Sequence, residues 1–160
     1  MAQKVDIYAL ISEKLGCEHK NPEDLSSLAL AFIGDAVYEL VLRSKVISDF
    51  NRSVKELNYF GSALAKAPTQ SEIIKKLIEE EMLSETELAI FKRGRNAKSN
   101  TSAKNATIGE YRDATGFEAL IGHLYLEGNT DRIIELSDYG FNFVIAKHGN
   151  PKDIKNKTNY

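Results

Sequence analysis

The sequence predicts an all-α protein built as a single domain. Three observations support this: helix-capping motifs recur along the chain, apolar residues follow helical spacing between them, and no segment alternates apolar and polar residues between hairpin turns. The chain has 160 residues, 42% of them hydrophobic, which is enough for one domain with a buried core. We expect this domain over residues 1–146, followed by a polar and flexible tail over residues 147–160.

Most predicted helices begin at a recognisable start signal. Asn21 followed by Pro22 offers an N-cap residue and a proline at the first helical position. Four capping boxes pair a hydroxyl with a glutamate three residues later: Ser53 with Glu56, Thr69 with Glu72, Ser84 with Glu87, and Thr107 with Glu110. Together with the apolar spacing, these signals predict helices over residues 3–15, 23–48, 53–66, 70–81, 84–92, 108–127 and 130–146.

The stretch 93–107 lacks a clear helical pattern, and Gly94 is expected to end the preceding helix in the left-handed conformation. A loop this long in a compact domain is usually functional or disordered. From residue 92 to residue 104 the chain has five basic residues and no acidic one: Lys92, Arg93, Arg95, Lys98 and Lys104. This composition favours phosphate binding, and the alternative is a solvated surface segment.

Composition narrows the possible partners and compartment. The net charge of −2 argues against a protein that coats nucleic acid over its whole surface, so nucleic-acid binding requires a local patch. The single cysteine, Cys17, excludes an internal disulfide and a cysteine metal cluster, which fits a reducing cytoplasm. The apolar runs are interrupted by charged residues and the N-terminus lacks a signal-peptide pattern, so we expect no membrane association.

Two carboxylates lie within apolar segments, where an unpaired negative charge destabilises the fold. Asp35 interrupts the apolar run 28–42, and Glu118 has a similar setting in the run 117–122. An unpaired carboxylate against a core costs several kcal/mol, so each should be neutralised, paired or bound to a metal. One alternative is a structural ion pair of Asp35 with a buried Arg43 or Arg112.

The other alternative is that the two acids meet at a metal ion. Gly34, Ala114 and Gly122 have almost no side chain, so the helices that carry Asp35 and Glu118 can cross closely there. Two adjacent carboxylates repel each other unless a cation lies between them, and oxygen ligands favour Mg²⁺ or Mn²⁺ over zinc. Such a metal can supply activated water for phosphodiester hydrolysis.

Three segments resemble the ribonuclease III family. The run Leu-Ala-Phe-Ile-Gly-Asp-Ala-Val-Tyr-Glu over residues 30–39 is similar to that family's signature helix, and Phe-Glu-Ala-Leu-Ile-Gly over residues 117–122 is similar to its second acidic motif. Between them, residues 93–99 resemble the basic loop of the Mini-ribonuclease III subfamily. The order and separation fit one catalytic domain over residues 20–146, without a double-stranded-RNA-binding domain after it.

The resemblance implies roles for individual residues. Asp35 and Glu118 take the places of the two motif carboxylates, as catalytic residues and Mg²⁺ ligands, with Mn²⁺ able to substitute. Full-length family members have two further acids, at the positions that are Ala31 and Thr115 here. The Mini subfamily resembles this chain in lacking these two acids, so the number of metal ions at each site stays open. Glu39 and Thr115 are candidates for contact with water around the metal.

The resemblance also implies an all-α homodimer that cuts both strands of double-stranded RNA and leaves 5′-phosphates. The Mini subfamily is associated with maturation of 23S ribosomal RNA precursors. In a dimer the basic segment occurs twice, so the five basic residues from Lys92 to Lys104 become the expected RNA contacts. The competing interpretation is a non-catalytic helical module that binds double-stranded RNA or acts as a scaffold, and it would need neither acid.

Overall fold

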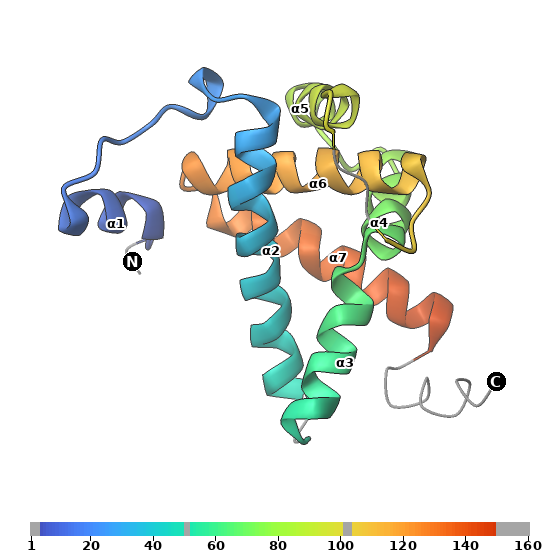
Figure 1. The fold of residues 1–160 in the computed structure, drawn as a ribbon. Coiled ribbons are helices and arrows are strands. Elements are labelled where there is room, and N and C mark those ends of the chain that lie inside the picture. The colour runs from blue at the N-terminus through green and yellow to red at the C-terminus, as the bar shows by residue number, and fades with distance from the viewer. Residues whose placement is uncertain (1–3, 50–51, 101–103, 150–160) are drawn as a thin grey trace.

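The structure is a computed structural model that describes residues 4–49, 52–100 and 104–149 (Figure 1). These residues form seven α-helices and one short 3-10 helix, and no strand occurs among them, which confirms the predicted all-α class. The elements are α1 (Ile7–Leu15), η1 (Pro22–Asp24), α2 (Ser27–Asp49), α3 (Val54–Ala65), α4 (Ala67–Glu79), α5 (Glu85–Asn96), α6 (Ile108–Leu126) and α7 (Thr130–His148).

Helix α6 lies at the centre of the arrangement and contacts α2, α4, α5 and α7. Figure 1 shows α2 running steeply across α6, with α5 above α6 and seen nearly end-on, and with α7 behind α2. Aromatic rings fill the junction between α2, α6 and α7. The ring centroid of Tyr38 lies 5.2 Å from that of Phe117 and 5.7 Å from that of Phe141, and all three side chains are fully buried. This junction fixes how α2 and α6 cross.

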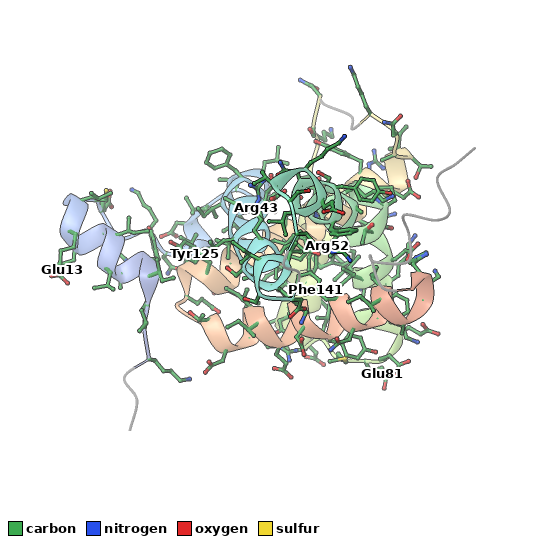
Figure 2. The ribbon with its side chains drawn as sticks, turned by 90° about the horizontal axis from the view of Figure 1, so that it is seen from below. Glu13, Arg43, Arg52, Glu81, Tyr125 and Phe141 are labelled. Carbon is green, nitrogen blue, oxygen red and sulfur yellow. The ribbon has the colours of Figure 1, made fainter. Side chains whose placement is uncertain are left out.

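Helix α1 stands to one side of the other helices (Figure 2). It begins at Ile7, later than the predicted residue 3, because Asp6 is its N-cap and accepts a hydrogen bond from the amide of Ala9. Its link to the rest of the domain includes a contact of Tyr8 with Tyr125, whose ring centroids are 5.7 Å apart. Residues 1–3 and 150–160, which include most of the predicted tail, lie outside the described residues.

Three of the four predicted capping boxes are confirmed, those of Ser53, Ser84 and Thr107. The box predicted at Thr69 is wrong because α4 already begins at Ala67, with proline in its first turn. The Thr69 hydroxyl donates instead to the carbonyl oxygen of Ala63 at 2.7 Å. Glu72 binds Lys147 and His148 at the end of α7, so the helix there continues two residues into the predicted tail.

The start of α2 and the end of α5 also differ from prediction, each by four residues. Asn21 and Pro22 do start a helical turn, but that turn is η1, and α2 begins only at Ser27. Helix α5 runs to Asn96, beyond its predicted end at residue 92.

Gly94 is therefore helical and buried, and it does not adopt the predicted left-handed conformation. A Cβ atom at Gly94 would lie 2.9 Å from both Ala119 Cβ and Gly116 Cα, so its missing side chain allows α5 to pack closely on α6.

Candidate active site

Helices α2 and α6 cross with their backbones in close contact at two glycines. A Cβ atom added to Gly34 would overlap the carbonyl oxygen of Glu118, and one added to Gly122 would overlap the carbonyl oxygen of Leu30. The close approach that the sequence predicted at Gly34 and Gly122 is therefore confirmed. As a consequence, Asp35, which follows Gly34, and Glu118, whose carbonyl oxygen contacts Gly34, are neighbours across the crossing.

Those neighbours are the two predicted carboxylates. Asp35 on α2 and Glu118 on α6 line one pocket of about 640 Å³. Ala31, Thr115 and Tyr111 line the same pocket, as does Ser99, which follows α5. Ala31 and Thr115, where the resemblance predicts that larger family members have two further acids, thus also face the pocket, as a small side chain and a hydroxyl. The Thr115 hydroxyl donates to the carbonyl oxygen of Tyr111 at 3.0 Å.

The electrostatics of the pocket show how costly the pair is. Burial is the main cause that raises the pKa of Glu118 to about 8, and repulsion from Asp35 is the second. A hydrogen bond from Gln70 acts in the opposite direction and lowers this pKa. Burial, followed by repulsion from Glu39, also raises the pKa of Asp35. Within the described residues, Asp35 forms no ion pair. Two acids held together without a cationic partner are an arrangement that a metal ion would stabilise.

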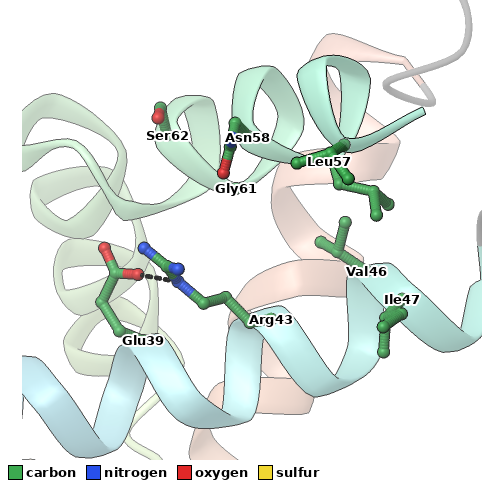
Figure 3. A pocket seen from close by; sticks show the side chains of 9 residues that line it. Glu39, Arg43, Val46, Ile47, Leu57, Asn58, Gly61 and Ser62 are labelled. Carbon is green, nitrogen blue, oxygen red and sulfur yellow. Dashed lines mark hydrogen bonds and ion pairs between the residues drawn. The ribbon is translucent and has the colours of Figure 1, made fainter. Parts of the chain in front are cut away.

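Among the described residues, the structure does not show the structural ion pair that was the alternative for Asp35. Arg43 binds Glu39 instead, with 2.7 Å between Arg43 Nε and Glu39 Oε2. Figure 3 shows this pair in a separate pocket of about 200 Å³ between α2 and α3, lined also by Asn58 and Ser62. The Glu39 carboxylate therefore points toward Arg43, although its charge still acts on Asp35 from one helical turn away.

Gln70 is a site residue that sequence reasoning missed. Its side chain is 1% exposed, and its Nε2 donates to Glu118 Oε1 at 3.0 Å and to the carbonyl oxygen of Ala65 at 2.8 Å. The one available signal was a polar amide on the apolar face of α4, among Ile73, Ile74 and Leu77.

We expect Glu118→Gln to stabilise the metal-free protein at alkaline pH. The folded-state pKa of about 8 lies above the ordinary value of 4.5, so the folded protein binds more protons than the unfolded chain between these values. The free energy of unfolding of the parent therefore falls as pH rises through this window. The free energy of unfolding of the variant does not fall for this reason, because glutamine does not titrate. Thermal melts in EDTA at about pH 5 and about pH 9 measure the difference, and parallel pH dependence of the two proteins would contradict the expectation.

The comparisons with known proteins agree with this geometry. Residues 28–129 match the family model described as the Ribonuclease III domain. The chain belongs to the ribonuclease III family. A protein named Mini-ribonuclease 3 from Thermoanaerobacter sp. (strain X514) is 48% identical over 116 residues, 71% of this chain and 80% of that protein. Another of that name, from Enterococcus faecalis (strain ATCC 700802 / V583), is 40% identical over 127 residues, 79% of this chain and 93% of that protein.

A solved structure supports the same assignment. The crystal structure of a protein from Fusobacterium nucleatum has a TM-score of 0.68 and 36% sequence identity with this chain, and the match covers 81% of this chain and 98% of that one. The resemblance to the Mini-ribonuclease III subfamily is thus confirmed, and the chain is an endoribonuclease of the ribonuclease III type. None of the helices in the described part of this ribonuclease III chain is long and apolar enough to cross a membrane.

The basic residues of this ribonuclease III chain lie in different surroundings. Arg95 Nε pairs with Asp113 Oδ1 at 2.7 Å, and the buried Asp113 also accepts a hydrogen bond from Ser71. Arg93 lines a different pocket, beside η1 and the start of α2. The remaining three, exposed to solvent on α5 and in the segment after it, are Lys92, Lys98 and Lys104.

The predicted basic loop is therefore shorter than residues 93–107, because its first four residues belong to α5. Residues 101–103 lie outside the described part of the chain.

Proposed function

We propose that the protein is a Mg²⁺-dependent endoribonuclease that cleaves double-stranded RNA and leaves 5′-phosphates, with 23S ribosomal RNA precursor as its substrate in the cytoplasm. The observation that carries this proposal is the single pocket shared by Asp35 and Glu118. The two acids come from helices far apart in the sequence, and the helices meet at two glycines where no other residue would fit.

The residues present fit a divalent metal ion. Asp35 and Glu118 offer carboxylate oxygens only, which suits Mg²⁺ and, by substitution, Mn²⁺. In the described ranges no group of three or more His, Cys, Asp or Glu side chains is arranged so that it could hold a metal ion, so the donor set is sparse. Mg²⁺ keeps several waters and needs few protein ligands. When bound, it would activate water and stabilise charge on the scissile phosphate.

The chain's own residues would prepare the site for this ion. Asp35 projects into the pocket without a cationic partner in the described residues, so its charge is available to a ligand. Glu118 is held from behind by Gln70. Thr115 and Glu39 are candidates for outer contacts with water, although the Glu39 carboxylate is already bound to Arg43.

We propose that the protein is a homodimer. Helix α2 leaves several large apolar side chains exposed in the single chain: Leu28, Phe32, Leu40 and Ile47. Phe32 is 83% exposed and lines the same pocket as Asp35. An exposed apolar strip of this kind marks an interaction surface, and a second copy of the chain would cover it and place two sites on one duplex.

We expect Phe32→Asp to convert the dimer to a monomer, because a charge in the centre of an apolar interface is left desolvated. Sedimentation velocity of the parent and the variant measures this. Ile134→Asp is the matched control, since Ile134 is an exposed apolar residue on α7. A monomeric parent, or a dimer unaffected by Phe32→Asp, would contradict the proposed interface.

Duplex RNA would be held by phosphate contacts from the basic residues. Lys98 and Lys104 are exposed, and Lys98 lies next to Ser99 at the pocket. We expect Lys98→Ala and Lys104→Ala each to weaken binding of a duplex and to reduce the slope of log affinity against log salt by about one, because one phosphate is no longer neutralised. The measurement is a salt titration by fluorescence anisotropy with catalysis blocked by EDTA. Lys55→Ala, an exposed lysine on α3, serves as the control, and an unchanged slope would refute the contact.

The function itself is tested by incubating the protein with a duplex RNA in Mg²⁺ and in EDTA. We expect cleavage in Mg²⁺ only, with 5′-phosphates on the products as detected by a 5′-phosphate-dependent exonuclease. A single-stranded RNA of the same sequence should remain intact. If the protein bound the duplex but did not cleave it with any divalent metal, the result would favour the non-catalytic module. That module is the alternative because Ala31 and Thr115 line the pocket where the resemblance predicts acids.

A further inference from the structure

Gln70 links the end of α3 to the carboxylate of Glu118. It lies in the first half of α4, and the two hydrogen bonds from its Nε2 go to Ala65, the last residue of α3, and to Glu118 on α6. The last carbonyl groups of a helix have no partner within that helix, so the Ala65 carbonyl needs an outside donor. Gln70 supplies this donor and directs its second amide hydrogen at Glu118.

The Ala65 carbonyl also determines which way the Gln70 amide points. A carbonyl oxygen can only accept, so a flipped amide would place Gln70 Oε1 against another acceptor. The amide nitrogen must therefore lie on this side, where it also reaches Glu118 Oε1. Gln70 thus offers Glu118 a donor, which is the interaction that a carboxylate requires and a purely apolar wall would not provide.

The remaining atom of the amide shows that this arrangement does not satisfy the whole Gln70 side chain. Gln70 Oε1 is buried and has no hydrogen-bond partner within the described residues. A buried acceptor without a partner destabilises the fold, whereas an apolar side chain of similar shape would avoid this. Gln70 therefore keeps Oε1 in the core without a hydrogen bond, while its Nε2 donates a hydrogen bond to Glu118 Oε1.

We propose that Gln70 is a positioning residue for Glu118, holding Oε1 by its hydrogen bond so that Oε2 faces the pocket and the divalent cation. This inference rests on the proposed metal-dependent function. Within the described residues, no donor contacts Glu118 Oε2. Partners that orient metal-binding carboxylates from behind commonly change metal affinity when they are removed.

The test is the affinity of the full chain for Mn²⁺, measured by isothermal titration calorimetry on the parent and on Gln70→Met. Methionine keeps the length of the side chain and removes both amide hydrogens. We expect the dissociation constant to rise by about 10- to 100-fold, the usual scale for removal of such a partner. Cleavage should need more Mg²⁺ to reach half its maximal rate and should recover at saturating Mg²⁺. The melting temperature should fall, since the variant removes two hydrogen bonds and leaves the Ala65 carbonyl without its outside donor. Loss of the unsatisfied Oε1 acceptor offsets part of this fall.

Ser71→Ala is the matched control. Ser71 is the next residue of α4, is equally buried, and donates to a carboxylate of the same helix α6, that of Asp113, at 2.8 Å. We expect it to lower the melting temperature without changing Mn²⁺ affinity. Gln70→Leu is the second variant, used if Gln70→Met does not fold.

Equal Mn²⁺ affinity of the Gln70 variants and the parent would overturn this inference alone. Equal weakening by Ser71→Ala would also overturn it, because loosening of α4 would then account for the weaker binding. A parent that binds no Mn²⁺, or binds it as well after Asp35→Asn, would overturn the proposed metal site together with the inference.

Discussion

Asp35→Asn should abolish detectable cleavage of duplex RNA and be the most damaging single change at the site. Among the described residues that line the pocket, Asp35 and Glu118 are the two acids. The resemblance assigns two further family acids to the positions of Ala31 and Thr115, so no third acid lines the pocket to replace the missing one. Loss of one electrostatic stabiliser commonly lowers turnover by about 10²- to 10³-fold, and loss of a ligand from a two-acid site should exceed this. Single-turnover cleavage rates in saturating Mg²⁺ measure the effect.

Unfolding cannot account for the expected loss of activity. The Asp35→Asn variant removes a charge that repels Glu118, so its melting temperature in EDTA should equal or exceed that of the parent. Glu39→Gln is the control one helical turn away, because its carboxylate is bound by Arg43 and points into the other pocket. We expect this control to reduce the rate by less than about 10-fold, below the roughly 10- to 100-fold loss that is usual when an outer contact of a metal site is removed. Parent-like cleavage by Asp35→Asn would refute the assigned site.

Gly34→Ala should destabilise the fold by at least about 3 kcal/mol, or prevent folding. The added methyl group would overlap the backbone of Glu118, which cannot rotate away as a flexible side chain can. The helices α2 and α6 would have to separate, and both the aromatic junction of Tyr38 with Phe117 and the carboxylate pair would be disturbed. Urea denaturation followed by circular dichroism measures the free energy of unfolding.

Gly61→Ala provides the matched comparison. Gly61 is also a helical glycine, but an added Cβ there meets no atom within 4 Å. The intrinsic preference of helices for alanine should then stabilise the protein, by up to about 1 kcal/mol. Equal behaviour of the two variants would show that α2 and α6 cross less closely than the structure has them.

The sequence was sufficient to predict the helices and the meeting of the two acids. Capping motifs depend on residues three apart, so the boxes at Ser53, Ser84 and Thr107 could be recognised from the chain alone. The α2–α6 crossing was predictable because a glycine within an apolar helix leaves room for a second backbone to approach. The same reasoning was wrong at Gly94, since a glycine near a helix end fits both a left-handed cap and a close helix contact.

Contacts between distant elements could not be predicted in the same way. The bond of Gln70 to Glu118 and the pairing of Arg95 with Asp113 each join residues from different helices, and no local pattern links their positions. The basic residues around Arg95 in the sequence favoured a contact with RNA. In the structure its guanidinium pairs with the buried Asp113, whereas Lys98 near it is exposed, and composition alone could not show this difference. The contact of Arg95 with RNA stays a prediction.

The central position of α6 has a consequence for synthesis of the protein on the ribosome. Helices α2, α4 and α5 each pack against α6, which begins only at Ile108. A nascent chain that ends before Ile108 has the helix that carries Asp35 but lacks α6, the main packing partner of that helix, and it lacks Glu118 altogether. Folding must therefore wait for the last third of the chain, and we expect the unfinished nuclease to be unable to cut RNA while it is still attached to a ribosome.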